Sequence, residues 1–196
     1  MIRNPHTLED SWWDGPKRFQ YINRNVASSI QTEDMFKYLK LFAPDGIMID
    51  IGGSYLSNGK PSSWSAETKP YILKLNILSD NCDIKNTRAE ILPFQNESVS
   101  LIVSAHTVEH IKGDLSATFK EWVRVLKFGG LIGIVMPNKK HFLHNTEVVE
   151  DGKKAYHELE PDELLKLFSE LPVEILLFNS RQNNFDFEII VRKIKV

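Results

Sequence analysis

Two apolar segments joined by a helical pattern constrain the fold of this 196-residue chain more than any other feature. Residues 98–105 (SVSLIVSA) and 131–137 (LIGIVMP) are short, nearly continuous apolar runs, typical of strands buried on both faces. Apolar residues recur at helical spacing over 115–126, Asp114 can cap the start, and Gly129-Gly130 are expected to end the helix. A strand, a helix and a second strand in this order predict a parallel strand pair.

Other segments extend this alternation toward both ends of the chain. Apolar runs predict strands at 47–51, 71–77, 173–179 and 187–193 and a short one within 82–86, and amphipathic spacing predicts helices at 32–42 and 161–171. Residues 54–70, rich in Ser, Gly, Pro and Asn, predict a loop. We therefore expect an α/β fold whose mostly parallel sheet has helices on both faces and an antiparallel C-terminal hairpin. Residues 1–30 are expected to form an N-terminal arm or lid, and 31–196 a single domain.

Composition argues against several classes of function. The formal net charge is −2 and no basic run or stripe is present, so a nucleic-acid partner is not expected. Cys82 is the only cysteine, which excludes an intrachain disulfide and a multi-cysteine zinc site and fits a reducing compartment. The longest apolar runs, such as LIGIVM, are far shorter than the roughly 20 residues of a membrane span. Because the first residues lack the apolar core of a secretory signal, we expect a cytoplasmic protein.

The segment HTVEH (106–110) has the spacing of a zinc-peptidase motif, with two histidines four residues apart and a glutamate beside the second. That reading requires His106 and His110 to lie on one helix, because only helical geometry brings side chains four residues apart together. The residues before His106 end a predicted strand, and Gly113 follows soon after. We therefore expect a strand-to-helix junction with at most one helical turn, and no metal site.

Four runs resemble class I S-adenosylmethionine-dependent methyltransferases, and they are most similar to the branch called methyltransferase type 11. The runs, in the order found in that family, are IMIDIGGS (47–54), AEILPFQNESVSLIVSAHTVEHI (89–111), EWVRVLKFGGLIGIVMPN (121–138) and YHELEPDELLKLF (156–168). The resemblance covers about residues 45–170. It implies a Rossmann-like sheet, S-adenosyl-L-methionine as the cofactor, and methyl transfer to a small-molecule or glycan-type acceptor.

The resemblance also implies where the cofactor would bind. Glycines at the end of the first strand allow a tight turn and a close approach of the ligand to the main chain. The implied cofactor-binding residues are Asp50, Gly52, Gly53, Ser54, Asn76, Arg88, Ala89, Glu90 and His106. Asn76 takes the place of an acid that binds the ribose hydroxyls in relatives, and Arg88 takes the place of an acid near the adenine.

Candidate catalytic groups are the histidines His106, His141 and His144. Methyl transfer requires positioning of donor and acceptor, and a base only when the acceptor must lose a proton. Histidine titrates near neutrality, so it can accept that proton. We expect His106 to form a wall of the cofactor or acceptor pocket, and Glu109 and His110 to be structural. The alternative function is a catalytically silent relative that serves as a binding or partner subunit.

Overall fold

A computed structural model describes residues 35, 39, 42–53, 72–77, 79–138, 156–179 and 186–195 of the chain. The strands are β1 (Ile47–Ile51), β2 (Ile72–Asn76), β3 (Ile84–Lys85), β4 (Val99–Ala105), β5 (Leu126–Pro137), β6 (Val173–Asn179) and β7 (Asp186–Lys193). The helices are α2 (Leu115–Val125) and α3 (Pro161–Ser169), and a short 3-10 turn, η4, spans Val108–His110. None of the helices in these ranges is long and apolar enough to cross a membrane.

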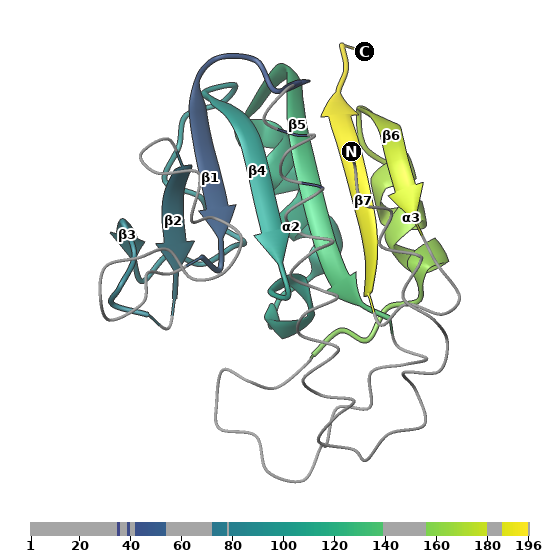
Figure 1. Ribbon diagram of the computed structural model, residues 1–196, viewed down its shortest axis with the longest axis horizontal. Coiled ribbons are helices and arrows are strands. Elements are labelled where there is room, and N and C mark those ends of the chain that lie inside the picture. Colours follow the sequence, from purple (N-terminus) through teal and green to yellow (C-terminus); the bar gives the residue numbers. More distant parts are fainter. Residues whose placement is uncertain are drawn as a thin grey trace, which may run out of the picture.

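The seven strands form one sheet in the order β3-β2-β1-β4-β5-β7-β6 (Figure 1). β3, β2, β1, β4 and β5 run parallel to one another, whereas β7 runs antiparallel to both β5 and β6. The expected α/β sheet with an antiparallel C-terminal hairpin is therefore confirmed. From β1 the chain builds β2 and β3 on one side, and β4 and β5 then lie on the other. The strand order therefore reverses between β1 and β4, the position at which open α/β sheets bind ligands.

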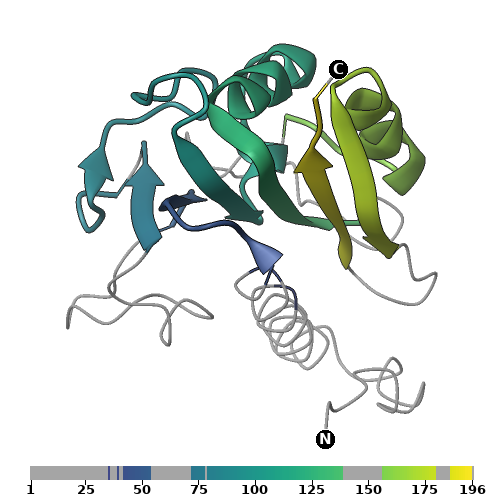
Figure 2. The same cartoon turned by 90° about the horizontal axis from the view of Figure 1, so that it is seen from above.

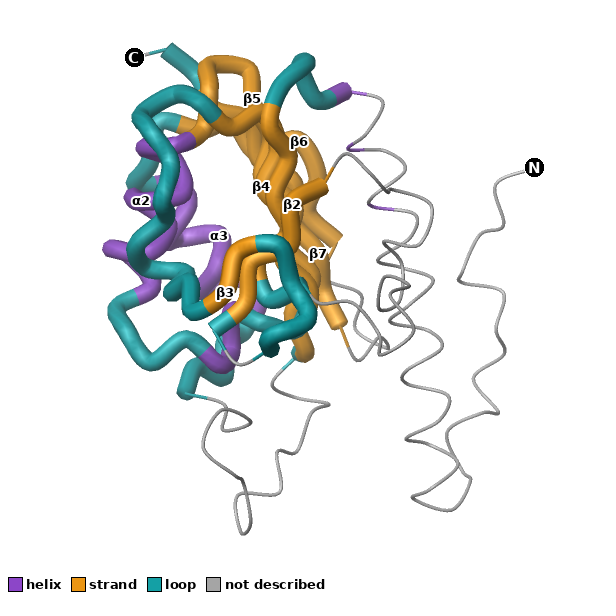
Figure 3. The backbone as a smooth tube through the Cα atoms, turned by 90° about the vertical axis from the view of Figure 1, so that its left-hand side faces the viewer, coloured by secondary structure: helices purple, strands orange, loops and turns teal. Residues whose placement is uncertain are grey.

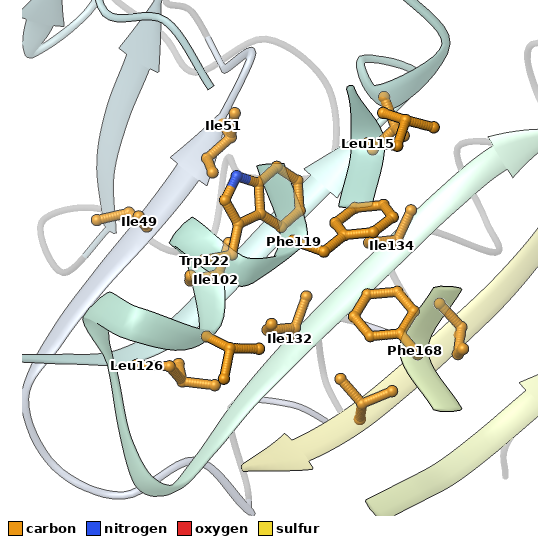
Figure 4. Packing of buried hydrophobic residues seen from close by; sticks show 14 of the residues in the cluster. Ile49, Ile51, Ile102, Leu115, Phe119, Trp122, Leu126, Ile132, Ile134 and Phe168 are labelled. Carbon is orange, nitrogen blue, oxygen red and sulfur yellow. The ribbon is translucent and has the colours of Figure 1, made fainter. Parts of the chain in front are cut away.

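Helices α2 and α3 pack side by side on one face of the sheet (Figures 2 and 3). Phe119 of α2 stacks on Phe168 of α3 with ring centroids 4.6 Å apart, and both rings are fully buried against strand residues (Figure 4). On the opposite face, Met35 and Leu39, which have helical backbone, pack with buried residues of β4 and β5. The helical pattern of the sequence thus supplies apolar side chains to both faces of the sheet.

The end of helix α2 differs from the sequence prediction. The helix ends at Val125 and β5 begins at the next residue, so Gly129-Gly130 lie inside the strand and do not end the helix. The ladder with β4 passes from the pair Val99–Leu126 to the pair Leu101–Leu131, so the glycines lie in a bulge of β5. Gly129 has a φ of 76°, a conformation that glycine adopts without strain. The fully buried Leu126 starts the strand because its side chain packs in the core.

Helices α2 and α3 each begin directly after a residue that caps them. Asp114 accepts a hydrogen bond from the main-chain N–H of Ser116 at 2.9 Å, as the sequence predicts. Helix α3 begins with a capping box between Glu160 and Glu163 and with Pro161 in its first turn. The expected N-terminal arm (1–30) and the expected loop at 54–70 lie outside the described residues.

Candidate active site

A cavity of about 460 Å3 lies at the carboxyl ends of β1, β2 and β4, the edge to which their arrows point in Figure 1. Strand ends, the loop after β3 and the segment around η4 form its wall. The lining residues are Ile51, Gly52, Leu75, Asn76, Ile77, Thr87, Arg88, Ala89, Glu90, His106, Thr107, His110, Ile111, Lys112 and Tyr156. Its volume is within the range of roughly 300–1,000 Å3 that is usual for sites of small molecules and cofactors.

The turn after β1, which we call the glycine turn (Gly52-Gly53), has no room for side chains. Gly52 has a φ of 89°, and a Cβ atom there would collide with the side chain of Thr107. A Cβ atom on Gly53 would overlap the carboxylate of Asp50. The Gly52 N–H donates to the carbonyl oxygen of Leu75 at 2.8 Å, which ties the turn to β2. Glycine is therefore required here both by conformation and by packing.

Behind the glycine turn, Asp50 forms a buried ion pair with Lys74. The two residues are directly opposite in the β1–β2 ladder, and Lys74 Nζ lies 3.0 Å from Asp50 Oδ2. Their side chains are only 2% and 6% exposed, for Lys74 and Asp50 respectively. Burial raises the pKa of the Asp50 carboxyl, and the charge and hydrogen bond of Lys74 oppose that rise. Asp50 does not line the cavity, so it acts on the site through the turn.

Asn76, the last residue of β2, connects its side-chain amide to the glycine turn. Its Nδ2 group donates to the carbonyl oxygens of Gly52 at 2.9 Å and of Gly53 at 3.3 Å. Its Oδ1 atom accepts a hydrogen bond from the main-chain N–H of Ser79 at 3.0 Å. Asn76 also lines the cavity. Its amide therefore joins the turn after β1 to the turn after β2.

The loop after β3 forms the opposite wall of the cavity. The carbonyl oxygen of Ala89 accepts a hydrogen bond from Trp122 Nε1 at 2.9 Å, which fixes this loop on helix α2. Arg88 Nη2 lies 2.9 Å from Glu90 Oε1, with Arg88 mostly exposed and Glu90 19% exposed. Burial acts to raise the pKa of Glu90, but the hydrogen bond and charge of Arg88, with a main-chain hydrogen bond, lower it overall.

His106 lies at the end of β4 between two buried carboxylates. Its Nδ1 atom is 3.6 Å from Glu109 Oε1, and its Nε2 atom is 3.6 Å from Asp186 Oδ2 at the start of β7. Its φ of 51° turns the chain out of the strand, and its N–H donates to the carbonyl oxygen of Val135 at 3.0 Å. We call His106, Glu109 and Asp186 the histidine cluster.

The histidine cluster changes the charge expected of His106. Burial acts to lower the pKa of the imidazole, but the hydrogen bonds and charges of Asp186 and Glu109 outweigh it and raise the pKa to about 10. The side chain is therefore an imidazolium at neutral pH. The two buried carboxylates stabilise the charged form of His106, which disfavours the proton-accepting role expected of it; that role stays a prediction.

Glu109 also holds the segment before α3 against the cavity. Its carbonyl oxygen accepts hydrogen bonds from the N–H groups of Tyr156, at 2.7 Å, and His157, at 3.1 Å. Its side chain is 2% exposed, and within the described ranges its Oε2 atom is buried without a hydrogen-bond partner. The ammonium of Lys112 lies 5.5 Å from the ring centre of Tyr156. Glu109 thus contributes main-chain contacts to the wall and a buried negative charge beside His106.

The structure places the residues named from the sequence in three groups. Those that line the cavity are Gly52, Asn76, Arg88, Ala89, Glu90 and His106. Asp50, behind the glycine turn, and Gly53, within it, are not among the residues that line the cavity. Those outside the described residues are Ser54, His141 and His144. The binding and catalytic roles of all these residues stay predictions.

Sequence reasoning missed part of the wall. The missed residues are Ile51, Leu75, Ile77, Thr87, Thr107, Ile111 and Lys112. Ile51 and Ile77 end predicted strands, and that position was the signal that could have identified them. His110, expected to be structural, lines the cavity as well, at the end of the single turn η4. His106 precedes that turn, and within the described residues no three His, Cys, Asp or Glu side chains are placed to hold a metal ion.

Comparisons with known proteins agree with this architecture. The family described as "Methyltransferase domain" matches residues 63–134. A search of curated proteins gives no match. Among solved structures, a SAM-dependent methyltransferase from Thermotoga maritima, described as a possible histamine N-methyltransferase, is 20% identical, with 90% of this chain and 97% of that chain covered and a TM-score of 0.60.

Two further solved structures show the same fold. Geranyl diphosphate C-methyltransferase from Streptomyces coelicolor, in complex with S-adenosyl-L-homocysteine, is 11% identical with a TM-score of 0.64, covering 95% of this chain and 88% of that one. A methyltransferase from Methanococcus maripaludis is 21% identical with a TM-score of 0.55 and covers 92% of each chain. At these identities the likeness establishes the fold.

Proposed function

We propose that this chain transfers the methyl group of S-adenosylmethionine, bound in the cavity, to a small-molecule or glycan-type acceptor. The observation that carries the proposal is the cavity of about 460 Å3 beside the glycine turn. It lies at the point where the strand order reverses, and its size suits a nucleoside with an amino-acid tail. The aliphatic side chains of Ile77, Leu75 and Ile111 can make apolar contacts with the faces of an adenine ring.

Some residues of the cavity would bind the methyl donor, and others would orient the acceptor. Bound S-adenosylmethionine supplies an electrophilic methyl group on a sulfonium. Gly52 leaves the main chain bare on the cavity wall, so a ligand can approach it closely. His106, as an imidazolium, would donate hydrogen bonds or attract negative charge, and would not remove a proton.

An acceptor that must lose a proton would therefore need another base. His141 and His144 remain the candidates for that role, and both lie outside the described residues. A nitrogen acceptor that already has a free lone pair would need no base. We also propose a cytoplasmic location, which the single cysteine supports because it fits a reducing compartment.

Titration calorimetry with S-adenosylmethionine and S-adenosylhomocysteine tests the proposal directly. We expect binding of both, with S-adenosylhomocysteine released in turnover assays when a suitable acceptor is supplied. Absence of binding at millimolar ligand would overturn the proposal and favour the catalytically silent relative.

Gly52→Ala sharpens this experiment. The new methyl group would collide with Thr107 in the cavity wall, so we expect affinity for S-adenosylhomocysteine to fall at least about tenfold, a loss of roughly 1.4 kcal/mol. Gly129→Ala is the matched control, because Gly129 also has positive φ but a Cβ atom there meets nothing within 4 Å. Equal affinities for the two variants would contradict the placement of the ligand beside the glycine turn.

A further inference from the structure

The amide of Asn76 faces the glycine turn with its donor side. Nδ2 lies between the carbonyl oxygens of Gly52 and Gly53, at 2.9 and 3.3 Å, so both of its hydrogens point to main-chain acceptors. Oδ1 is engaged by the N–H of Ser79 at 3.0 Å. This pattern fixes the orientation of the amide. In a flipped amide, Oδ1 would face the carbonyl oxygens of Gly52 and Gly53, and the NH2 group would face the N–H of Ser79, so that no hydrogen bond could form.

The turns joined by this amide form two sides of the cavity. Gly52 and Asn76 both line it, and Ile77, the residue after Asn76, lines it as well. The N–H of Gly52 is already bonded to the carbonyl oxygen of Leu75, so the donors of Asn76 complete the attachment of the turn to β2. Without them, two partly buried carbonyl groups would lose their side-chain partner, and their removal from water would no longer be compensated.

We infer that Asn76 is a positioning residue that holds the glycine turn in its binding conformation, and that the nitrogen of its amide, rather than the oxygen, carries this role. The acid that relatives have at this position could not fill the same role. An aspartate has nearly the same shape but cannot donate a hydrogen bond when ionised, and its charge would face two carbonyl oxygens. Placing an acid at this position should therefore weaken cofactor binding in this chain. This inference rests on the proposed function only for the identity of the ligand.

The experiment compares Asn76→Asp and Asn76→Ala with the unmodified chain by calorimetry with S-adenosylhomocysteine. We expect Asn76→Asp to bind about 10- to 100-fold more weakly than the unmodified chain and no better than Asn76→Ala. Direct recognition of the ligand by Oδ1 gives the opposite order, with the aspartate variant binding more tightly than the alanine variant, and that result would overturn the inference. Asn81→Asp, an exposed position in the same loop, controls for the added charge.

Hydrogen exchange measured without ligand separates this inference from the proposed function. In Asn76→Ala we expect faster exchange at the amides of Gly52 and Gly53, with the amides of β4 unchanged. This result would support the positioning role even if the unmodified chain bound no S-adenosylhomocysteine, an outcome that would overturn only the proposed function. Unchanged exchange at both glycines would overturn the positioning role whatever the calorimetry shows. The alanine variant also answers the question if the aspartate variant does not fold.

Discussion

The two ends of the cavity differ in how their polar groups are satisfied. At the glycine turn, the amide of Asn76 has partners for both its nitrogen and its oxygen, and the buried carboxylate of Asp50 has a buried ammonium beside it. In the histidine cluster, one imidazolium lies between two buried carboxylates, and a buried oxygen of Glu109 has no hydrogen-bond partner within the described ranges. The first end pairs one buried acid with one buried ammonium. In the second, two buried acids share the imidazolium of His106, and His110 Nε2 lies 3.8 Å from Glu109 Oε1.

This difference indicates different tasks for the two ends. A balanced, fully bonded turn is rigid before any ligand arrives, which reduces the entropy lost on binding. Uncompensated buried charge is costly, and such groups are typical of places where a ligand or a chemical step makes use of them. We therefore expect substitutions at the glycine turn to change stability and donor affinity together. Substitutions in the histidine cluster should change pH dependence more than the fold.

Lys74→Met is expected to have the largest effect, because it removes one partner of the buried pair. The Asp50 carboxylate would remain buried without its ammonium, and breaking such a pair typically costs about 3–5 kcal/mol. We expect the free energy of unfolding, measured by urea titration, to fall by that amount. Lys85→Met on β3 is the matched control, since Lys85 is 54% exposed and its partner Asp80 is 92% exposed.

Adding Asp50→Asn to Lys74→Met should recover part of the lost stability, because a neutral amide is far less costly to bury than an unpaired charge. No recovery in this double variant would mean that the aliphatic packing of Lys74, rather than its charge, stabilises the turn. An equal loss in Lys74→Met and Lys85→Met would show that burial of the pair does not govern its energy.

Lys74 also marks the limit of what the sequence could predict. Six of the seven strands begin and end within two residues of their predicted ranges, all but β5, because apolar runs and turn residues are local signals. A lysine within a strand is normally taken as exposed, and its partner Asp50 lies 24 residues earlier in the chain. Only the parallel register of β1 and β2 brings them together, and no local pattern encodes that register.

The site shows the same limit. Gly52, Asn76 and the loop at 88–90 were identified from motifs that lie next to strand ends, and they do line one cavity. The environment of His106 was missed because Asp186 begins the second strand of the C-terminal hairpin and approaches His106 only through the β5–β7 pairing. The end of α2 was predicted wrongly because a glycine pair ends a helix and forms a bulge equally well.

Asp186→Asn should have an intermediate effect, and one that depends on pH. In the native chain the pKa of His106 is about 10, against 6.5 for an ordinary histidine, so the folded state holds an extra proton between these values. The stabilisation is fully present below about pH 6.5 and is lost as pH rises through 10. Removing one carboxylate should lower the pKa of His106 and reduce stability near neutral pH by about 1 kcal/mol, a modest figure because the imidazole is partly exposed to screening.

NMR titration of the His106 imidazole and urea titrations at several pH values check this prediction. We expect the stability difference between the native chain and Asp186→Asn to shrink as pH increases from 6.5 toward 10. Asp80→Asn applies the same chemical change at an exposed carboxylate and should leave the titration unaltered. A native His106 that titrates near 6.5 would restore it as a candidate base.

Arg88→Gln is expected to have the smallest effect, because this side chain is 57% exposed and pairs with Glu90 at the mouth of the cavity. A solvent-screened pair of this kind contributes little to stability, so the free energy of unfolding should hardly change. We expect affinity for S-adenosylhomocysteine to fall about threefold at low salt and the difference to disappear near 0.5 M salt, where charges are screened within a few ångströms. Arg192→Gln, in a surface pair with Glu174 on β6, supplies the comparison. A tenfold loss of affinity that persisted in high salt would instead place the guanidinium in direct contact with the ligand. Arg88 would then belong, with the glycine turn, to the part of the cavity that binds the donor.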